Sequence, residues 1–134
     1  MPQTRATVVD NLVSLLQSVP GMRRATALHE PPDKQWANAP YVGVIVASEE
    51  RRVDDGTDIL WLARIELLLV AKNENLDYMI DGCKEKLLDH AEDQIGAKYV
   101  GLSTIEKTHL LEFQEYGSAR LGLDVYYLSQ RGDI

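Results

Sequence analysis

Residues 40–72 read PYVGVIVASEERRVDDGTDILWLARIELLLVAK, and this stretch decides the fold because it holds two long strand patterns joined by a tight turn. One strand is expected from Pro40 to about Val53 and the other from Asp58 to Lys72, where apolar side chains recur with a period of two. The intervening Asp54-Asp55-Gly56-Thr57 is typical of a hairpin turn. The stretch therefore predicts an antiparallel β-hairpin.

The second of these strands carries apolar side chains on both of its faces. A single domain of this size has few helices with which to cover both sides of a sheet, and a large exposed apolar face usually binds a partner. We therefore expect the chain to be a subunit of an oligomer. One face is wholly apolar from Ile59 to Leu69, and the face that the helices would leave open reads Leu60, Leu62, Arg64, Glu66, Leu68 and Val70.

Two other segments have the three- and four-residue spacing of amphipathic helices. The first covers residues 4–19 and ends at Pro20-Gly21, because proline cannot continue the hydrogen-bond ladder. The second covers Leu76 to Gln94, follows the capping side chains of residues 73–75, and ends before Gly96. Each helix is predicted to bury one apolar stripe against the sheet.

The rest of the chain completes the predicted fold. A loop is expected from Lys98 to Glu106, followed by a second hairpin of Lys107 to Glu115 and Ser118 to Gln130. Arg24 to Glu30 is a candidate short strand. The prediction is a single α+β domain over residues 1–134, with a mainly antiparallel sheet of about four strands in two hairpins and two helices packed on one face.

Composition excludes several classes of protein. With 14 Lys and Arg against 21 Asp and Glu, the net charge of −7 argues against a surface that grips nucleic acid, which needs clustered basic residues. No apolar run reaches the roughly 18 to 20 residues that a membrane helix needs. The single cysteine excludes an intramolecular disulfide. We expect a soluble protein without a signal peptide, made in a reducing compartment.

No motif in the chain indicates catalysis or a bound cofactor. His29, His90 and His109 lack the spacing of a metal site, and Cys83 lies on the apolar stripe of the second helix, as a core residue would. The turn after Val53 resembles a calcium loop only in part, because its twelfth position is the apolar Ile65. We therefore expect no enzyme activity, no cofactor and no metal.

Two surfaces are candidates for binding other proteins. The hairpin tip from Glu49 to Asp58 should project from the body, although a solvated tip would have the same composition. The open face should contact neighbouring subunits or line a lumen. The candidate interface residues are Glu49, Glu50, Arg51, Arg52, Val53, Asp54, Asp55, Leu60, Leu62, Arg64, Glu66, Leu68 and Asp124.

The order of elements resembles a known family, the tail terminator proteins of long-tailed phages of the lambda type. The resemblance rests on the length, the first helix, the segment APYVGVIVASEERRVDDGTDILWLARIELLLVAKNENLDYMIDGCKEKLL and the final strand GSARLGLDVYYL. These parts cover about two thirds of the chain, and residues 98–106 have no counterpart in the pattern.

The resemblance implies a structural virion protein with no enzyme activity. Such proteins form a hexameric ring on the head-proximal end of the tail, where they cap the tube, end its polymerisation and present a surface to the head. The implied partners are other copies of the chain, the major tail tube protein and head connector or neck proteins. DNA would pass through the lumen only as cargo, and no membrane is involved. Assembly would take place in the cytoplasm of a bacterial host.

Three alternatives remain open at this point. One is a small enzyme of ferredoxin-like or similar α+β fold, against which the lack of any paired acid/base or nucleophile constellation argues. A neck or tail-completion protein bound to the head connector would share the same organisation. A small oligomeric adaptor of non-viral origin would share the composition and the apolar sheet face.

Overall fold

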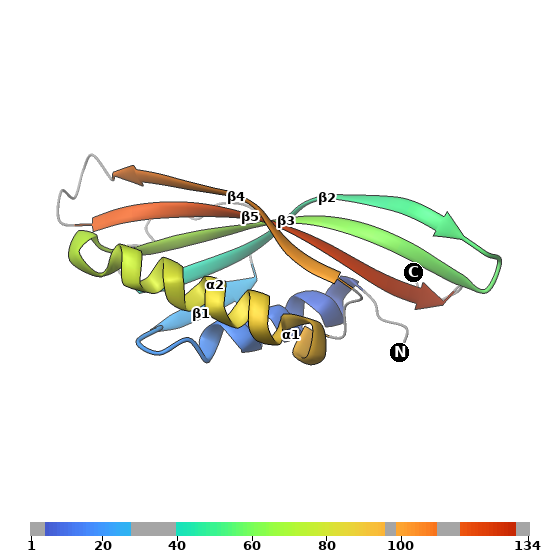
Figure 1. The fold of residues 1–134 in the computed structure, drawn as a ribbon, viewed down its shortest axis with the longest axis horizontal. Coiled ribbons are helices and arrows are strands. Elements are labelled where there is room, and N and C mark those ends of the chain that lie inside the picture. Colours follow the sequence, from blue (N-terminus) through green and yellow to red (C-terminus); the bar gives the residue numbers. More distant parts are fainter. Residues whose placement is uncertain (1–4, 28–39, 96–98, 110–115, 131–134) are drawn as a thin grey trace.

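The computed structural model describes residues 5–27, 40–95, 99–109 and 116–130, and Figure 1 shows their arrangement. Two helices lie on one side of a long, strongly twisted sheet. The elements are α1 (Arg5–Gln17), β1 (Arg24–Ala27), β2 (Tyr41–Asp54), β3 (Asp58–Lys72), α2 (Asn73–Ile95), β4 (Tyr99–His109) and β5 (Tyr116–Gln130).

The sheet has five strands in the order β1-β2-β3-β5-β4. β1 runs parallel to β2 and pairs only with Tyr41–Val44, whereas all other neighbours are antiparallel. The predicted α+β class, the first hairpin and the two helices on one face are therefore confirmed. A second hairpin-like pair, β4 with β5, is also present, but only residues 107–109 of its predicted first strand, Lys107 to Glu115, lie in β4, and residues 110–115 lie outside the described residues. A sheet of about four strands was expected, and the structure adds a short fifth strand. It lies within residues 24–30, which the sequence offered as a candidate strand, and its described part is Arg24–Ala27.

The predicted loop at residues 98–106 is wrong, because residues 99–109 form β4 and pair with β5. A β-bulge between Leu102 and Thr104 explains the error. Leu102 and Ile105 are three residues apart, yet their partners Leu123 and Leu121 are only two apart. The extra residue breaks the period of two from which a strand is predicted.

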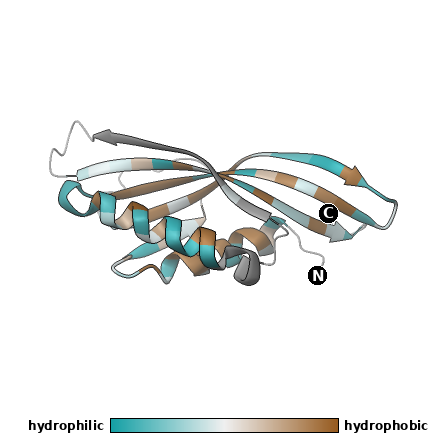
Figure 2. Ribbon diagram, in the orientation of Figure 1, coloured by the Kyte–Doolittle hydropathy of each residue, from teal (hydrophilic) through white to brown (hydrophobic). Residues whose placement is uncertain are grey.

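The core lies between the two helices and one face of the sheet, where apolar residues gather in Figure 2. Each fully buried aliphatic side chain stabilises the fold by about 1.5–3 kcal/mol relative to exposure. The helices contribute Val8, Leu12, Leu15, Leu16, Leu76, Met79, Ile80, Cys83 and Leu87, and the sheet contributes Val42, Val44, Ile65, Leu67, Leu69, Leu121, Leu123 and Val125.

A tight turn after α1 brings the two helices together. The amide of Met22 donates to the carbonyl of Val19 at 3.0 Å, and Gly21 has a φ of 85°, which favours glycine. Val19 then packs against α2 at Gly82, where an added Cβ would lie 2.8 Å from a Val19 methyl carbon. The absence of a side chain at Gly82 therefore sets how closely the helices approach.

We predict that Gly82→Ala destabilises the protein, although alanine is the better helix former by about 0.5–1 kcal/mol. The new methyl group collides with the buried Val19, and overpacking of this kind costs about 1–3 kcal/mol. Chemical denaturation should show a lower midpoint for Gly82→Ala in the natural background. In a Val19→Ala background the same change should raise the midpoint, and a loss of stability in both backgrounds would contradict the contact.

Cys83 is a core residue, as its position on the apolar stripe predicted. Its side chain is buried, and burial raises the pKa of its thiol to about 12. The reactive thiolate is therefore scarce at neutral pH.

We expect Cys83 to resist thiol reagents in the folded protein. A chromogenic thiol reagent is mixed with the protein at neutral pH, and its absorbance reports the reaction. The folded protein should show no modification in the time that a denatured sample needs to react completely. Fast labelling of the folded chain would show that α2 detaches readily from the sheet.

Candidate interaction surface

The sheet face opposite the helices is hereafter called the open face. Register places its residues in cross-strand rows, such as Ser48–Arg64–Asp124, Glu50–Leu62–Tyr126 and Gly43–Leu68–Arg120. On the described strands it consists of Tyr41, Gly43, Ile45, Ser48, Glu50 and Val53 of β2, Leu60, Leu62, Arg64, Glu66, Leu68 and Val70 of β3, and Ser118, Arg120, Gly122, Asp124, Tyr126 and Leu128 of β5. Five of these residues are buried in the folded chain, namely Leu62 and, toward the end of the sheet away from the hairpin, Tyr41, Gly43, Val70 and Ser118.

The open face is apolar toward both ends of the strands and charged in the middle. Leu60 and Leu128 near the hairpin, and Ile45 and Leu68 beyond the charged band, are each half-buried. Arg64 and Glu66 lie between these two pairs, and Arg120 lies opposite Leu68. All three are exposed. Half-buried leucines on a face without helices are suited to further burial against another protein.

Leu62 is the exception among the predicted interface leucines, because only 3% of its surface is exposed. Its cross-strand neighbours are Glu50 and Tyr126, and Arg52 is hydrogen-bonded to both. The Arg52 guanidinium therefore bridges the row that contains Leu62. The hydrogen bond with Tyr126, and then the charge of Glu50, raise the pKa of Arg52. Leu62 is thus mainly a packing residue of the folded monomer, which corrects its expected place among the exposed interface leucines.

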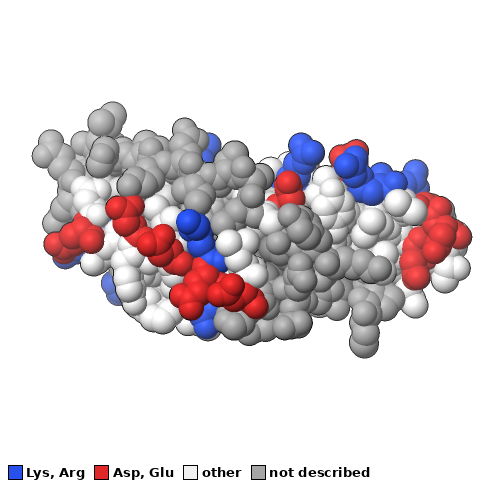
Figure 3. Space-filling model, in the orientation of Figure 1, with Lys and Arg blue, Asp and Glu red and all other residues white. Residues whose placement is uncertain are grey.

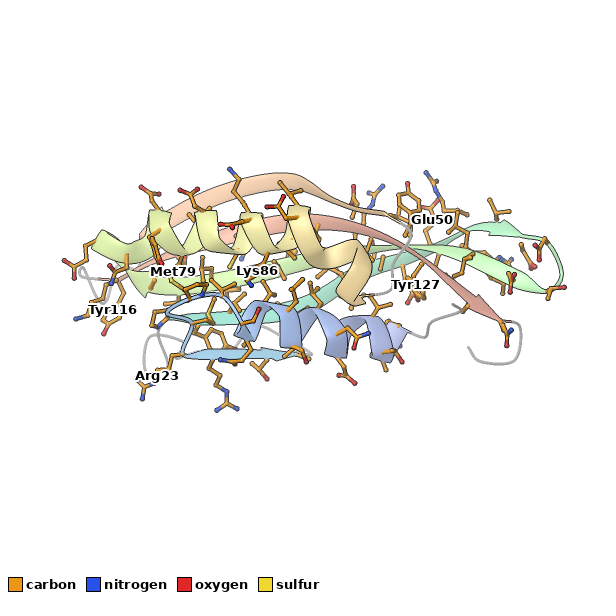
Figure 4. The ribbon with its side chains drawn as sticks, turned by 60° about the horizontal axis from the view of Figure 1, so that its bottom comes forward. Arg23, Glu50, Met79, Lys86, Tyr116 and Tyr127 are labelled. Carbon is orange, nitrogen blue, oxygen red and sulfur yellow. The ribbon has the colours of Figure 1, made fainter. Side chains whose placement is uncertain are left out.

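Glu49 was also expected to project toward a partner, and it does not. It lies on the helix side of β2, opposite Ala63, and its side chain is only 17% exposed. The Tyr127 hydroxyl donates a hydrogen bond to Glu49, and Arg5 at the start of α1 forms an ion pair with it at 3.2 Å. Figure 4 shows Tyr127 near Glu50, where the helix-covered part of the sheet ends.

Beyond this point β2, β3 and β5 continue as a three-stranded arm without helices (Figure 1). The arm comprises residues 50–62 and the facing end of β5. Its tip is acidic, as the right-hand end of Figure 3 shows. Two of its arginines are already paired, Arg51 with Asp54 at 3.6 Å and Arg52 with Glu50 at 3.0 Å. Val53, in contrast, is 57% exposed.

The acidic residues of the tip build the turn. Asp55 accepts hydrogen bonds from the amides of Thr57 at 2.9 Å and Asp58 at 2.7 Å, while Asp54 accepts from Gly56 at 2.9 Å. Gly56 has a φ of 93°, which glycine adopts readily. The amide bonds from Asp58 and Thr57 hold the pKa of Asp55 below its ordinary value. The carboxylates of Asp54 and Asp55 therefore accept hydrogen bonds from backbone amides of the turn itself. Aspartates commonly play this part in turns, which accounts for the partial resemblance to a calcium loop.

We predict that Asp55→Ala loosens the tip while the core stays folded. Because the folded-state pKa of Asp55 is lowered, its contribution is present above the unfolded pKa and is lost as the pH falls through the lowered value. Hydrogen exchange, corrected for pH, should show faster exchange at Thr57 and Asp58 in the variant at neutral pH, and a smaller difference in acid. Asp89→Ala on the exposed surface of α2 is the matched control, and equal exchange in both variants would refute the role of Asp55.

The sheet edges are less suited to association than the open face. β1 covers only the first four residues of β2, and the rest of that edge carries bulges between Val46 and Ser48 and between Arg51 and Val53. β4, at the other edge, is also bulged. Bulges and charged side chains are common means by which proteins prevent strands from adding to a sheet edge.

Chemical sites are not evident in the described part of the chain. There, no group of three or more His, Cys, Asp and Glu side chains could hold a metal ion. Neither described helix is long and apolar enough to cross a bilayer. Of the histidines considered from the sequence, His29 lies outside the described residues, as do the side chains of His90 and His109.

The structure therefore brings together Leu60, Arg64, Glu66, Leu68 and Asp124 of the predicted interface on one face. Sequence reasoning left out other residues of the same face, although the period of two along β2 and β5 could have found them. Among those that are exposed or half-buried are Ile45, Arg120, Tyr126 and Leu128.

Comparison of the chain with known protein families and with curated proteins gives no match.

Proposed function

We propose that the chain is a structural virion protein that forms a ring on the head-proximal end of a phage tail tube, ends tube polymerisation and offers a joining surface to the head. The observation that carries the proposal is the contrast between the two faces of one sheet. Helices cover one face over the body of the sheet, whereas the other face presents half-buried leucines and the strands continue into an arm without helices.

The open face and the arm would serve different contacts in such a ring. Leu60, Leu68 and Leu128 offer apolar surface whose burial against a neighbouring subunit is favourable. The arm extends beyond the helices and can reach a neighbouring subunit, the tube or the head connector. The bulged sheet edges also favour contacts through the face over strand addition.

The charge balance is compatible with the passage of DNA through the ring. A net charge of −7 leaves little tendency to retain a polyanion, since retention needs clustered Lys and Arg. DNA would then be transient cargo in the lumen. The other proposed partners are the major tail tube protein and a head connector or neck protein.

We predict that Leu68→Asp abolishes tube capping and leaves the monomer folded. Leu68 is half-exposed, so the substitution costs little within one chain but places a charge in the contact. The experiment polymerises the cognate tube protein in the presence of each variant and measures tube lengths and end-bound rings by electron microscopy.

Leu88→Asp is the matched control, because Leu88 is a 55% exposed leucine on α2, away from the open face. It should cap tubes like the unmodified protein. Tubes of unlimited length with the unmodified protein would refute the capping role. Rings that bind the connector but not the tube would show a neck protein instead.

A further inference from the structure

A hollow of about 440 Å³ lies between the first turns of α1 and the edge of β2. The described part of β1 ends at Ala27, opposite Val44, so no described strand adjoins the β2 edge beyond that point. Of the apolar side chains that line the hollow, Val44 is buried, whereas Val9 and Val46 are half-buried and pack against the core. We call this hollow the α1–β2 groove.

The α1–β2 groove has the size and polarity to take aliphatic side chains of another protein. An engineered apolar cavity of about 150 Å³ holds a benzene molecule, so the groove has room for about two or three aliphatic side chains. The charged residues that line it, Arg5 and Asp10, are exposed. An apolar floor with charges toward the solvent matches the apolar core and polar rim of a protein interface.

The arm presents an apolar surface of matching size. Register places Val53, Leu60 and Leu128 side by side across its three strands. Val53 is 57% exposed, and both leucines are half-buried. The arm therefore offers three aliphatic side chains close to its acidic turn.

The arm cannot reach the groove of its own chain. Both features lie on β2, where Val46 and Val53 are seven residues apart on one extended strand. At about 3.3 Å per residue, this places them about 20 Å apart. A protein segment that occupies the groove therefore comes from another chain.

The distribution of charge favours a second copy of this chain as the occupant. Residues 5–27 hold three arginines and one aspartate, a net charge of +2 in a chain whose total is −7. Arg23 and Arg24 are exposed and form no ion pair with another described residue. The arm holds four acidic side chains and two arginines, a net charge of −2, and both arginines are already paired within it. Surfaces of opposite charge on one chain favour contact between copies.

We propose that the arm of one copy occupies the α1–β2 groove of the next, so that copies join head to tail. The three aliphatic residues of the arm enter the groove, and the acidic turn lies beside Arg5 of the next copy. Arg5 stays 63% exposed although it pairs with Glu49. The arm enters past Arg23, which Figure 4 shows toward the end of the molecule away from the arm.

Spacing along the strands agrees with this direction of entry. Tyr41, which lies opposite Arg24, is three residues from Val44, or about 10 Å. Glu50 likewise precedes Val53 by three residues, so it comes to Arg24 when Val53 reaches Val44. The contact joins side chains, so the bulge that discourages strand addition at this edge does not oppose it.

A contact between two different surfaces of one chain repeats from copy to copy, and it closes into a ring when the rotation between copies fits. The ring rests on the proposed function, and the inference assigns the arm to the contact between its neighbouring subunits. The contact between arm and groove is measured on the free protein, without tubes.

The test uses one variant of each surface and measures mass by light scattering and sedimentation over a concentration series. Val53→Asp places a charge on the arm, and Ala6→Glu places one at the groove. Both positions are exposed, so far-UV circular dichroism should remain unchanged. The unmodified chain should form assemblies larger than twice its mass of 15.1 kDa. Each variant should be monomeric, with a dissociation constant raised about a hundredfold or more, because an unpaired charge is costly to bury.

An equimolar mixture of the two variants should give a pair of twice the single mass and nothing larger. Val53→Asp keeps an intact groove and Ala6→Glu keeps an intact arm, so one contact forms and no intact surface remains to extend it. Leu88→Asp and Ser14→Glu are matched controls at exposed positions outside both surfaces. They should assemble like the unmodified chain.

Three results would overturn the proposal. These are a monomeric unmodified chain at every soluble concentration, assembly that stops at a dimer, or a mixture of the variants that stays monomeric. If either variant fails to fold, Val53→Ser and Ala6→Gln replace the pair and should each raise the dissociation constant about tenfold.

The tube-capping assay separates this inference from the proposed function. Capped tubes with Val53→Asp would remove the arm from the subunit contact and leave the capping role standing. Assemblies of the unmodified chain that fail to cap tubes would leave the contact standing and remove the capping role.

Discussion

The unbroken pairing of β3 with β5 is the constraint on which the other features of this protein depend. The register runs without a shift from Asp58 opposite Gln130 to Lys72 opposite Tyr116. A slip of one residue would turn every side chain of either strand to the wrong face. This ladder fixes which leucines enter the core, which remain on the open face and where the charged band lies.

The ladder gives the sheet two faces, of which one forms the core and the other remains available for association. The helix-covered face holds a continuous apolar core, closed by the contact of Val19 with Gly82. The open face cannot be covered by the described helices, because both lie on the other side. Its half-buried leucines remain compatible with a folded monomer and gain from burial against another chain. The same strands therefore stabilise the fold and provide the surface on which the proposed function depends.

Most of the fold could be predicted because its signals are local. The period of two from Tyr41 onward, the acidic turn at Asp54 and the helical spacing around Met79 each predicted the element that forms. β4 was missed because a bulge at Leu102 breaks its period, and bulges depend on pairing with a distant strand. The position of β1 beside β2 likewise depends on a parallel pairing that no local pattern specifies.

The candidate surface could be predicted as a face but not residue by residue. Alternation placed Arg64, Glu66 and Leu68 together correctly. It could not show that Arg52 bridges Glu50 and Tyr126 across Leu62, because that contact joins three strands. Nor could it show that Glu49 turns inward to Tyr127 and Arg5, since those residues are 78 and 44 positions away in the chain. The function itself rests on resemblance and on the unused face, and it stays a proposal.

The continuity of the strands has a mechanical consequence for the arm. β3 and β5 pass from the core into the arm with no intervening loop and no shift in register, whereas β2 is bulged just before the arm, between Val46 and Ser48. Arg5, Glu49 and Tyr127 brace that base by linking α1 to the outer strands. A displacement of the acidic tip would therefore be passed to the core along the paired β3 and β5, the two strands whose hydrogen-bond ladder is unbroken.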